Sequence, residues 1–413
     1  MDRIILHCDM NNFFASVECM LNPALRGQPV AVCGSVKDRH GIVLAKNELA
    51  KAAGVSTGEA IWRARQKCPA LVTVEPHYDE YARISRAARR IYGRYTDLVE
   101  PFGMDECWLD CTGSTRLFGS GEEIAERIRR EIFSELGVTV SVGVSFNKIF
   151  AKLGSDMKKP DAVTVISRER FREQIWGLPV TDLLGVGAAT GKRLLSFGIR
   201  TIGDLALFPE EPLRRTLGKC GTMLRRYALG LDFSSVTPHD GDCPDQSVGH
   251  GVTTAADLVT GEEVEAVILS LTEEIGHRLF LYGKKAEGIS VSVRDSRLRV
   301  REWQCPLVLP TQSPRIIARE AFRLFVKSYG WENPLRSVTV RAIRLSSAEA
   351  TGQLTVFDGL DRDQRFEAAD RAVEGIRRRF GRAAIRSASL LSESKLPEKH
   401  LGSLFPGRGA SIG

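Results

Sequence analysis

The sequence predicts an α+β protein built from several domains, and three observations carry this prediction. Its 413 residues exceed one ordinary domain and suggest roughly two to four. Residues 3–8 form an apolar run, and residues 138–146 alternate valine with small or polar residues; both patterns indicate strands. Residues 122–136 place isoleucines four positions apart, which makes one face of an amphipathic helix. Strands and helices therefore alternate along the chain.

Glycine, proline and charge divide the chain further. We expect a first domain over residues 1–180, with a largely helical insertion over about 25–80. Residues 181–231 indicate short helices broken by glycine, and they carry eight Lys or Arg against four Asp or Glu. A linker rich in Asp, Pro and Gly follows at 232–245. The basic excess is therefore concentrated just before this linker.

The region after the linker has its own pattern. Residues 246–350 are predicted to form strand, long helix, two strands, helix and strand, which is a β-α-β-β-α-β unit. Residues 351–413 contain a charged segment, Asp361 to Phe380, that indicates another helix, and a tail rich in Gly and Ser. We expect a second compact domain followed by an extension.

Composition narrows the classes of protein. No run approaches the roughly 20 apolar residues that a membrane span needs, and charges at Asp2 and Arg3 come too early for a signal peptide. We therefore expect a cytoplasmic protein without a membrane partner. Nine cysteines without a CxxC pair are expected to be reduced, with Cys107 and Cys111 in the core. A net charge of +7 permits nucleic-acid binding without demanding it.

Two groups of carboxylates follow or open predicted strands. Asp9 ends the first strand, and Asp105-Glu106 opens another. Strand neighbours point to opposite faces, so Asp105 and Glu106 converge only if the chain turns there, which Gly103 allows. Three acids near phosphates suit Mg²⁺, and two such ions could clamp both oxygens of a phosphoryl transfer. Alternatively, Asp-Glu beside a glycine is only a solvated turn.

The sequence around these acids resembles the Y family of DNA polymerases, the low-fidelity lesion-bypass class, and most closely its bacterial DNA polymerase IV branch. The resemblance covers most of the chain, to about residue 390. It is carried by the segments Asp9–Glu18, Asn22–Val32, Tyr95–Glu106 and Ser141–Lys152.

The resemblance implies a right-hand polymerase fold. Residues 1–180 would form a ferredoxin-like palm and helical fingers (about 25–80), 181–231 the thumb, and 246–350 the little-finger domain. The enzyme would act as a monomer and extend a primer on template DNA with deoxynucleoside triphosphates. Asp9, Asp105 and Glu106 would be the catalytic carboxylates, and with the Met10 carbonyl they would hold two Mg²⁺ ions.

The resemblance also implies residues that contact the nucleotide. Phe14 falls at the family's steric gate against the sugar 2′-position, while Phe13 is expected mainly to pack in the core beside it. Lys159 matches a lysine that reaches the triphosphate. The family usually has Tyr and Arg on the helix where this chain has Glu48 and Lys51. Lys51 remains a candidate nucleotide ligand, but lysine cannot reproduce arginine's fork, which puts this contact in doubt.

DNA contacts are predicted in two places. The segment 183–187, with Gly185 and Gly187, followed by Lys192, has the form of a helix-hairpin-helix whose glycines let backbone N–H groups approach a phosphate. A plain helical turn is the alternative. In the little finger, a group of arginines on or beside predicted strands is expected to meet template phosphates: Arg294, Arg297, Arg299 and Arg301.

One short segment indicates a protein partner. Residues 353–357 resemble the peptide by which bacterial polymerases bind the sliding clamp, with Gln353, Leu354 and Phe357 as the contacting side chains. Two other classes stay open: an accessory protein that kept a polymerase fold without catalysis, and a nucleotidyl cyclase, which also uses paired carboxylates on two metals. The three acids and Phe14 argue against the first, and the hairpin element and 246–350 argue against the second.

Overall fold

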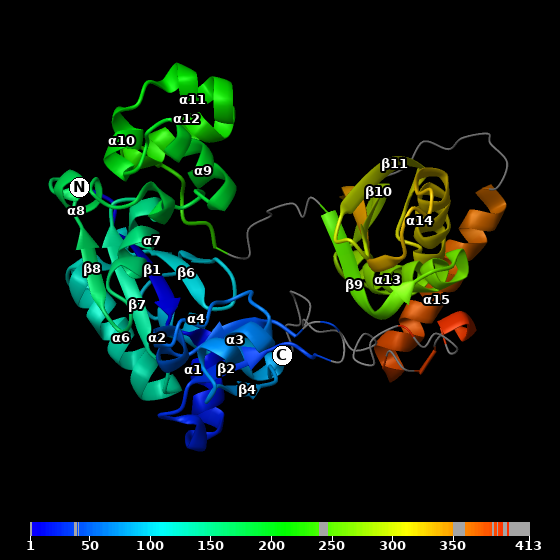
Figure 1. Cartoon of the computed structure of the whole chain (residues 1–413), viewed down its shortest axis with the longest axis horizontal. Helices are drawn as coiled ribbons and strands as arrows, with labels where there is room; N and C mark the ends of the chain where they lie inside the picture. The colour runs from blue at the N-terminus through cyan, green and yellow to red at the C-terminus, as the bar shows by residue number, and fades with distance from the viewer. Residues whose placement is uncertain are drawn as a thin grey trace. The chain divides into compact units, whose positions relative to one another are not determined.

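The structure, a computed structural model, describes residues 2–36, 39, 41–238, 247–349, 360–381, 384–385, 387–390 and 395. The chain divides into two units, Met1–Gly34 with Ile42–Asp242, and Ser35–Gly41 with Cys243–Gly413 (Figure 1). The boundary between Asp242 and Cys243 falls inside the predicted linker, whereas the boundaries on either side of Ser35–Gly41 were not predicted. Within the part of the chain that is described, no helix is both long enough and apolar enough to cross a membrane.

A five-stranded sheet forms the centre of the first unit, in the order β5-β6-β1-β7-β8. Its central strand β1 is antiparallel to both β6 and β7, whereas β7 and β8 are parallel. The strands are β1 (Ile5–Met10), β5 (Val99–Pro101), β6 (Glu106–Asp110), β7 (Val140–Ser145) and β8 (Val163–Ile166). Both strands predicted in this region, at 3–8 and 138–146, are confirmed as β1 and β7.

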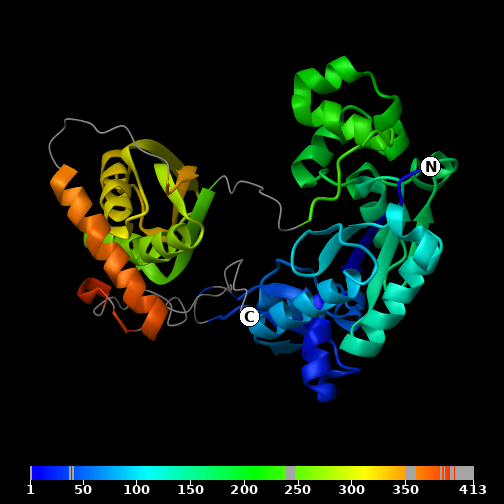
Figure 2. The ribbon, with the colours of Figure 1, turned by 180° about the vertical axis from the view of Figure 1, so that it is seen from behind.

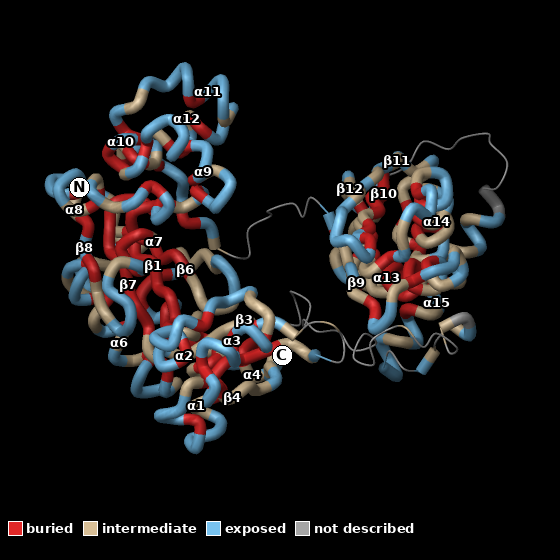
Figure 3. Tube along the Cα trace, in the orientation of Figure 1, coloured by how far each residue is buried: buried red, intermediate tan, exposed pale blue. Residues whose placement is uncertain are grey.

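The two faces of β1 have different neighbours, because successive side chains alternate across a strand. Leu6, Cys8 and Met10 pack in a core with α4 (Tyr78–Tyr92) and α6 (Gly121–Leu136). The isoleucines of α6, which predicted this helix, are fully buried there. His7 and Asp9 lie on the other face, where α7 (Lys148–Met157) covers the sheet. Figure 3 shows β1 and β7 as buried strands within the unit.

Helix α7 lies unusually close to β7, and a glycine makes this approach possible. A Cβ atom at Gly143 would lie 1.9 Å from the Ala151 carbonyl oxygen and 2.4 Å from the Ser155 nitrogen. No side chain fits in that space. The helix begins after Asn147, whose side chain accepts a hydrogen bond from the Phe150 backbone N–H.

The segment predicted as the fingers, about 25–80, contains more strand than the sequence indicated. A three-stranded sheet, in the order β3-β2-β4, accompanies the expected helices. Its middle strand β2 (Val30–Cys33) is an apolar run buried along its whole length, which favours a strand over a surface helix. The other elements here are α1 (Phe13–Leu21), β3 (Val43–Lys46), α2 (Glu48–Ala52), α3 (Ile61–Lys67) and β4 (Val72–Val74).

The segment predicted as the thumb, 181–231, forms short helices, which agrees with the prediction of its local structure: α9 (Ala188–Ser196), α10 (Ile202–Leu207), α11 (Glu210–Leu217) and α12 (Lys219–Ala228). Their apolar core is shared with α8 (Phe171–Ile175), α7 and β8.

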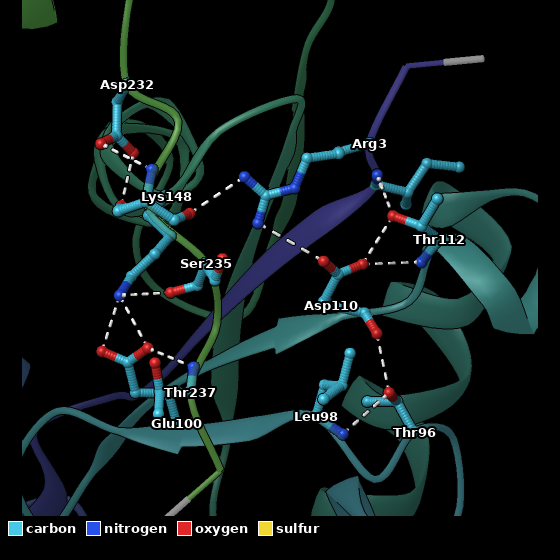
Figure 4. Close-up of polar contacts among 12 residues, drawn as sticks. Arg3, Thr96, Leu98, Glu100, Asp110, Thr112, Lys148, Asp232, Ser235 and Thr237 are labelled. Carbon is cyan, nitrogen blue, oxygen red and sulfur yellow. Dashed lines mark hydrogen bonds and ion pairs between the residues drawn. The ribbon is translucent and has the colours of Figure 1, made fainter. Parts of the chain in front are cut away.

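After α12 the chain returns to the palm, and this part of the predicted linker is bound there (Figure 4). Lys148 Nζ donates to both Glu100 carboxylate oxygens, at 2.6 and 2.7 Å, and the Thr237 N–H donates to Glu100 at 2.8 Å. Val236 is buried against Trp108. The predicted linker therefore begins with a segment fixed to the palm.

The second unit has the predicted order β-α-β-β-α-β, with an antiparallel sheet in the order β11-β10-β12-β9. Its elements are β9 (Ser247–Leu258), α13 (Gly261–Leu281), β10 (Lys284–Asp295), β11 (Val300–Thr311), α14 (Pro314–Ser328) and β12 (Leu335–Ser347). The predicted charged helix is α15 (Leu360–Phe380), which packs against α14. In Figure 2 it is the long orange helix.

Candidate active site

Two of the predicted carboxylates lie directly opposite each other on neighbouring strands. Asp9 of β1 pairs in register with Glu106 of β6, so their side chains leave the same face of the sheet. Asp105 precedes β6 and its carbonyl accepts from the Met10 N–H at 3.1 Å. Gly103, with φ of 104°, provides the turn that was predicted before this strand. The chain thus brings the acids to one end of the β1/β6 pair.

Two lysines from the α7 region neutralise this cluster. Lys152 Nζ lies 2.6 Å from Glu106 Oε2 and 3.0 Å from Asp9 Oδ2. Lys159 Nζ lies 2.8 Å from Asp9 Oδ2 and 2.7 Å from Asp156 Oδ1. The side chains of Asp9 and Lys152 are only 7% and 13% exposed, so these charges interact with little screening by solvent.

Buried polar residues hold the surrounding backbone. Asn11 donates to Ser141 Oγ at 2.9 Å and accepts from the Asp161 N–H at 2.9 Å, which ties the loop after α7 to the sheet. His7 is fully buried, with Nδ1 2.9 Å from Ser155 Oγ and Nε2 3.2 Å from Glu106 Oε2. Nδ1 is therefore hydrogen-bonded, and Nε2 faces the Glu106 carboxylate.

Ionisation in the cluster is strongly perturbed. Burial, together with the negative charges of Asp9 and Glu106, raises the pKa of Asp105 to about 6. Burial also opposes ionisation of Glu106, but hydrogen bonding to His7 and Lys152 outweighs it and lowers the pKa of Glu106 to about 2. For Lys152, burial favours the neutral form, yet Asp9 and Glu106 raise its pKa above the usual value. The two adjacent acids, Asp105 and Glu106, therefore differ in proton affinity.

These groups line one open pocket of roughly 400 Å³. Palm and fingers both contribute to it. Its lining comprises Asp9, Met10, Asn12, Phe13, Phe14, Leu44, Ala45, Lys46, Thr57, Asp105, Glu106, Lys152, Asp156 and Lys159. The predicted catalytic residues, both phenylalanines and Lys159 are therefore brought together.

The wall at Phe14 is rigidly supported. Its ring stacks on Tyr81 with a centroid distance of 4.2 Å and an interplanar angle of 11°. Tyr81 in turn donates its hydroxyl hydrogen to Glu18, which is 3% exposed and also contacts His77. Phe13 is 3% exposed and packs in the core, as expected, while reaching the pocket lining.

Helix α2 carries Glu48 and Lys51, at the positions where the family usually has Tyr and Arg. Glu48 accepts from Asn12 Nδ2 at 3.0 Å, and Lys51 Nζ lies 3.7 Å from Glu48, with both side chains about half exposed. Lys51 is not among the residues that line the pocket, whereas Lys46 is, and Lys46 donates to Thr57 at 3.1 Å. Lys46 is thus the better-placed cation on this side.

The predicted DNA-contact residues are distributed over two elements. Gly185 has φ of 92° and Gly187 caps α9, on which Lys192 is exposed; the element before the hairpin is only a 3₁₀ turn, Val180–Asp182.

The little-finger arginines do not share one face. Arg301 pairs in register with Val293, a core residue, so it lies on the helix side, where it binds Glu332 at 2.7 Å. Arg299 is bound to Asp295 at 3.0 Å. Arg294 and Arg297 are exposed, and no acidic partner is seen for them among the described residues. The predicted clamp peptide, Gln353, Leu354 and Phe357, lies outside the described residues.

Sequence reasoning missed two residues of the site, Lys152 and His7. A signal for Lys152 exists: Lys152, Asp156 and Lys159 recur at spacings of four and three, which is one helix face. His7 lies two residues before Asp9 on the same strand face, so period two could have identified it.

The donor set fits a hard divalent cation. Ligand atoms of His7, Asp9 and Glu106 lie within 4.8 Å of one another, and Asp105 lines the same pocket. Since both nitrogens of His7 face protein groups, the available ligands are carboxylate and carbonyl oxygens, which Mg²⁺ prefers. His7 would then orient Glu106 from outside the coordination sphere.

Comparisons with known proteins agree with this geometry. The model of the impB/mucB/samB family matches residues 8–156, and the model of that family's C-terminal domain matches residues 245–356. DNA polymerase IV of Acetivibrio thermocellus is 48% identical over 396 residues, 96% of this chain and 99% of that protein. DNA polymerase IV 1 of Bacillus subtilis is 35% identical over 401 residues, 96% of this chain and 95% of that protein.

A solved structure shares the fold. The Y-family DNA polymerase chimera Dbh-Dpo4(243-245)-Dbh matches with a TM-score of 0.74 and 24% identity, covering 83% of this chain and 99% of that one. The family models and the relatives define the class as a Y-family DNA polymerase. Within that class, the chain belongs to the DNA polymerase IV family. It is a DNA-directed DNA polymerase, which excludes the cyclase and the non-catalytic accessory protein.

Proposed function

We propose that this pocket joins a deoxynucleoside triphosphate to a primer 3′-hydroxyl, using two Mg²⁺ ions held by Asp9, Asp105, Glu106 and the Met10 carbonyl. The observation that supports it best is the register of Asp9 opposite Glu106 at the edge of an open pocket. When bound, the ions would supply positive charge to the attacking and leaving oxygens.

The protein groups would supply position and selectivity. Lys159 lies on the pocket wall and would move from Asp9 to the triphosphate, where a lysine serves as a point charge. Phe14, backed by Tyr81, would exclude a 2′-hydroxyl by contact. Lys152 would keep Asp9 and Glu106 together before metal binds, because it neutralises both. Catalysis then needs no nucleophilic side chain.

We also propose that the enzyme works on primer-template DNA as a lesion-bypass polymerase and is tethered to a sliding clamp by residues 353–357. Membership of the DNA polymerase IV family supports the first part, and the peptide's resemblance to a clamp-binding motif supports the second.

The experiment is primer extension with Mg²⁺ and each deoxynucleotide, comparing the wild-type protein with Asp105→Ala. The variant should bind primer-template DNA within about twofold of wild type and lose at least about 10³-fold in extension rate, because a metal ligand is lost and no DNA contact. Extension near the wild-type rate would show that Asp105 is not part of the metal site.

A further inference from the structure

Helix α15 of the second unit separates its charges by face. Four of its five acidic residues recur at spacings of four, three and four, which places these four on one side of the helix. They are Asp363, Glu367, Asp370 and Glu374. Asp370 and Glu374 are each only 6% exposed.

This acidic side is fully used in docking the helix on its own domain. Each of these four acids has a partner on α13, on α14, at the end of β11 or in the segment that joins β11 to α14. Asp363 binds Arg319 at 2.8 Å, Glu367 accepts from Thr311 at 2.7 Å, Asp370 contacts Ser313 and lies 3.1 Å from Arg315, and Glu374 lies 2.8 Å from His277. The acids therefore hold α15 in one rotational setting about its axis.

That setting turns arginines outward. The exposed arginines are Arg362, Arg365, Arg371, Arg378 and Arg379. Of these, only Arg378 has an acidic partner among the described residues, Glu374 at 3.2 Å. Small side chains, Ala368, Ala372 and Gly375, lie exposed between them. No acidic side chain of α15 that the structure describes belongs to the exposed class.

An ordinary solvated helix face mixes both signs, because like charges on neighbouring turns repel. Here the domain pairs with four of the acids, and the exposed charged side chains that the structure describes on α15 are all arginines, spread over about 26 Å from Arg362 to Arg379. A polyanion with closely spaced charges is the matching partner, and duplex DNA carries one negative charge per about 1.7 Å of axis. The small residues let a sugar-phosphate backbone approach the helix closely.

We propose that the outer arginine face of α15, defined as Arg362, Arg365, Arg371, Arg378 and Arg379, binds the phosphate backbone of DNA. This contact lies outside the catalytic pocket and outside the sheet of the second domain, so it goes beyond the proposed function. It adds affinity without reading sequence, since phosphate contacts carry no base information.

The test is the salt dependence of primer-template binding, measured by fluorescence anisotropy for the full chain. The variant Arg365→Gln/Arg371→Gln/Arg379→Gln should reduce the slope of log K against log salt by about two to three, since each phosphate contact contributes about 0.9. Affinity near 0.1 M salt should fall on the order of tenfold. Glutamine favours helix, so α15 should stay folded, which its melting temperature checks.

Two matched variants distinguish a specific contribution of the α15 face to DNA binding from a general effect of the protein's positive charge. Lysine at the same three positions should restore the wild-type slope, because phosphate binding needs a charge there and not a particular fork. Arg83→Gln/Arg94→Gln/Arg130→Gln removes the same charge from α4, the turn after it and α6, and should leave the slope unchanged. An unaltered slope in the α15 variant, or an equal loss in the palm control, overturns the proposal. A defect seen only when a loaded clamp is present also overturns it and assigns the face to a protein partner.

Discussion

Lys152 Nζ lies 2.6 Å from Glu106 Oε2, between two carboxylates that would otherwise repel each other. Replacing Lys152 with Met should lower the free energy of unfolding of the metal-free protein by about 1–3 kcal/mol, because charged hydrogen bonds are lost. Millimolar Mg²⁺ should recover more of the melting temperature in this variant than in wild type. Lys158→Met, an exposed neighbour, is the control; an equal effect there would contradict the role of Lys152.

The ionised side chain of Asp105 should lower the stability of the metal-free protein, although the same side chain serves catalysis. Its pKa of about 6 in the folded protein exceeds the ordinary value of 3.8, so the folded state binds the proton more tightly than the unfolded state. The ionised carboxylate therefore destabilises the metal-free protein above pH 6, and this cost disappears as the pH falls through 6 toward 4.

The corresponding variant is Asp105→Asn, which should be more stable than wild type by about 1–3 kcal/mol at pH 7.5 and similar to it near pH 4. Urea unfolding of the metal-free proteins at both pH values measures this difference. A gain that is the same at both pH values would mean that the charge of Asp105 is not its source.

Phe14 should control discrimination between ribose and deoxyribose. Phe14→Ala removes the ring that stacks on Tyr81 and should raise ribonucleotide incorporation relative to deoxynucleotide by at least about tenfold, roughly the effect of 1.4 kcal/mol on the transition state. Single-nucleotide kinetics with both substrates measure the ratio, and Phe14→Tyr should keep it. Unchanged discrimination in Phe14→Ala would place the gate elsewhere.

Glu48 and Lys51 should weaken the contact with the triphosphate. The double change Glu48→Tyr/Lys51→Arg removes the carboxylate that binds Asn12 of the pocket lining and introduces a fork that can hold a phosphate at two points. The KM for deoxynucleotides should fall about three- to tenfold, and kcat should change less, if the gain is in ground-state binding. A KM that stays or rises would indicate that Lys46 already supplies this contact.

The segment 353–357 should act only as a tether. Leu354→Ala/Phe357→Ala removes apolar anchors of the kind that dominate peptide interfaces, so product length with a loaded clamp should fall to the clamp-free value. Single insertions without clamp should not change. Full clamp stimulation in the variant would assign the tether elsewhere, and a loss of basal insertion would make the segment structural.

The order of the elements could be predicted from the sequence because it depends on local patterns, whereas the role of the acids was inferred from the family resemblance. The spacing of the isoleucines in α6 indicates a helix, and the alternation of residues in β7 indicates a strand. The turn at Gly103 could be predicted because glycine allows backbone conformations that other residues rarely adopt. The three-stranded sheet of the fingers was missed because strands as short as Val72–Val74 carry too few residues to show a period.

Tertiary contacts were harder to infer. Lys152 and His7 depend on which element crosses β1, and Arg301 was grouped with Arg294 because one residue of register decides which face a strand side chain takes. The binding of Val236 and Thr237 to the palm could not be predicted from a segment whose composition indicates only a linker.

The absence of a side chain at Gly143 determines the distance between β7 and α7. Lys152 lies on α7, and Lys159 lies in the segment that follows α7. A single methyl group at residue 143 would push α7 away from β7. It would displace the Lys152 ammonium and the loop that carries Lys159 together, although neither lysine had been altered. The charge balance of the pocket thus depends on a residue between β7 and α7 that has no side chain, and a Gly143→Ala variant would resemble an active-site mutant in activity assays.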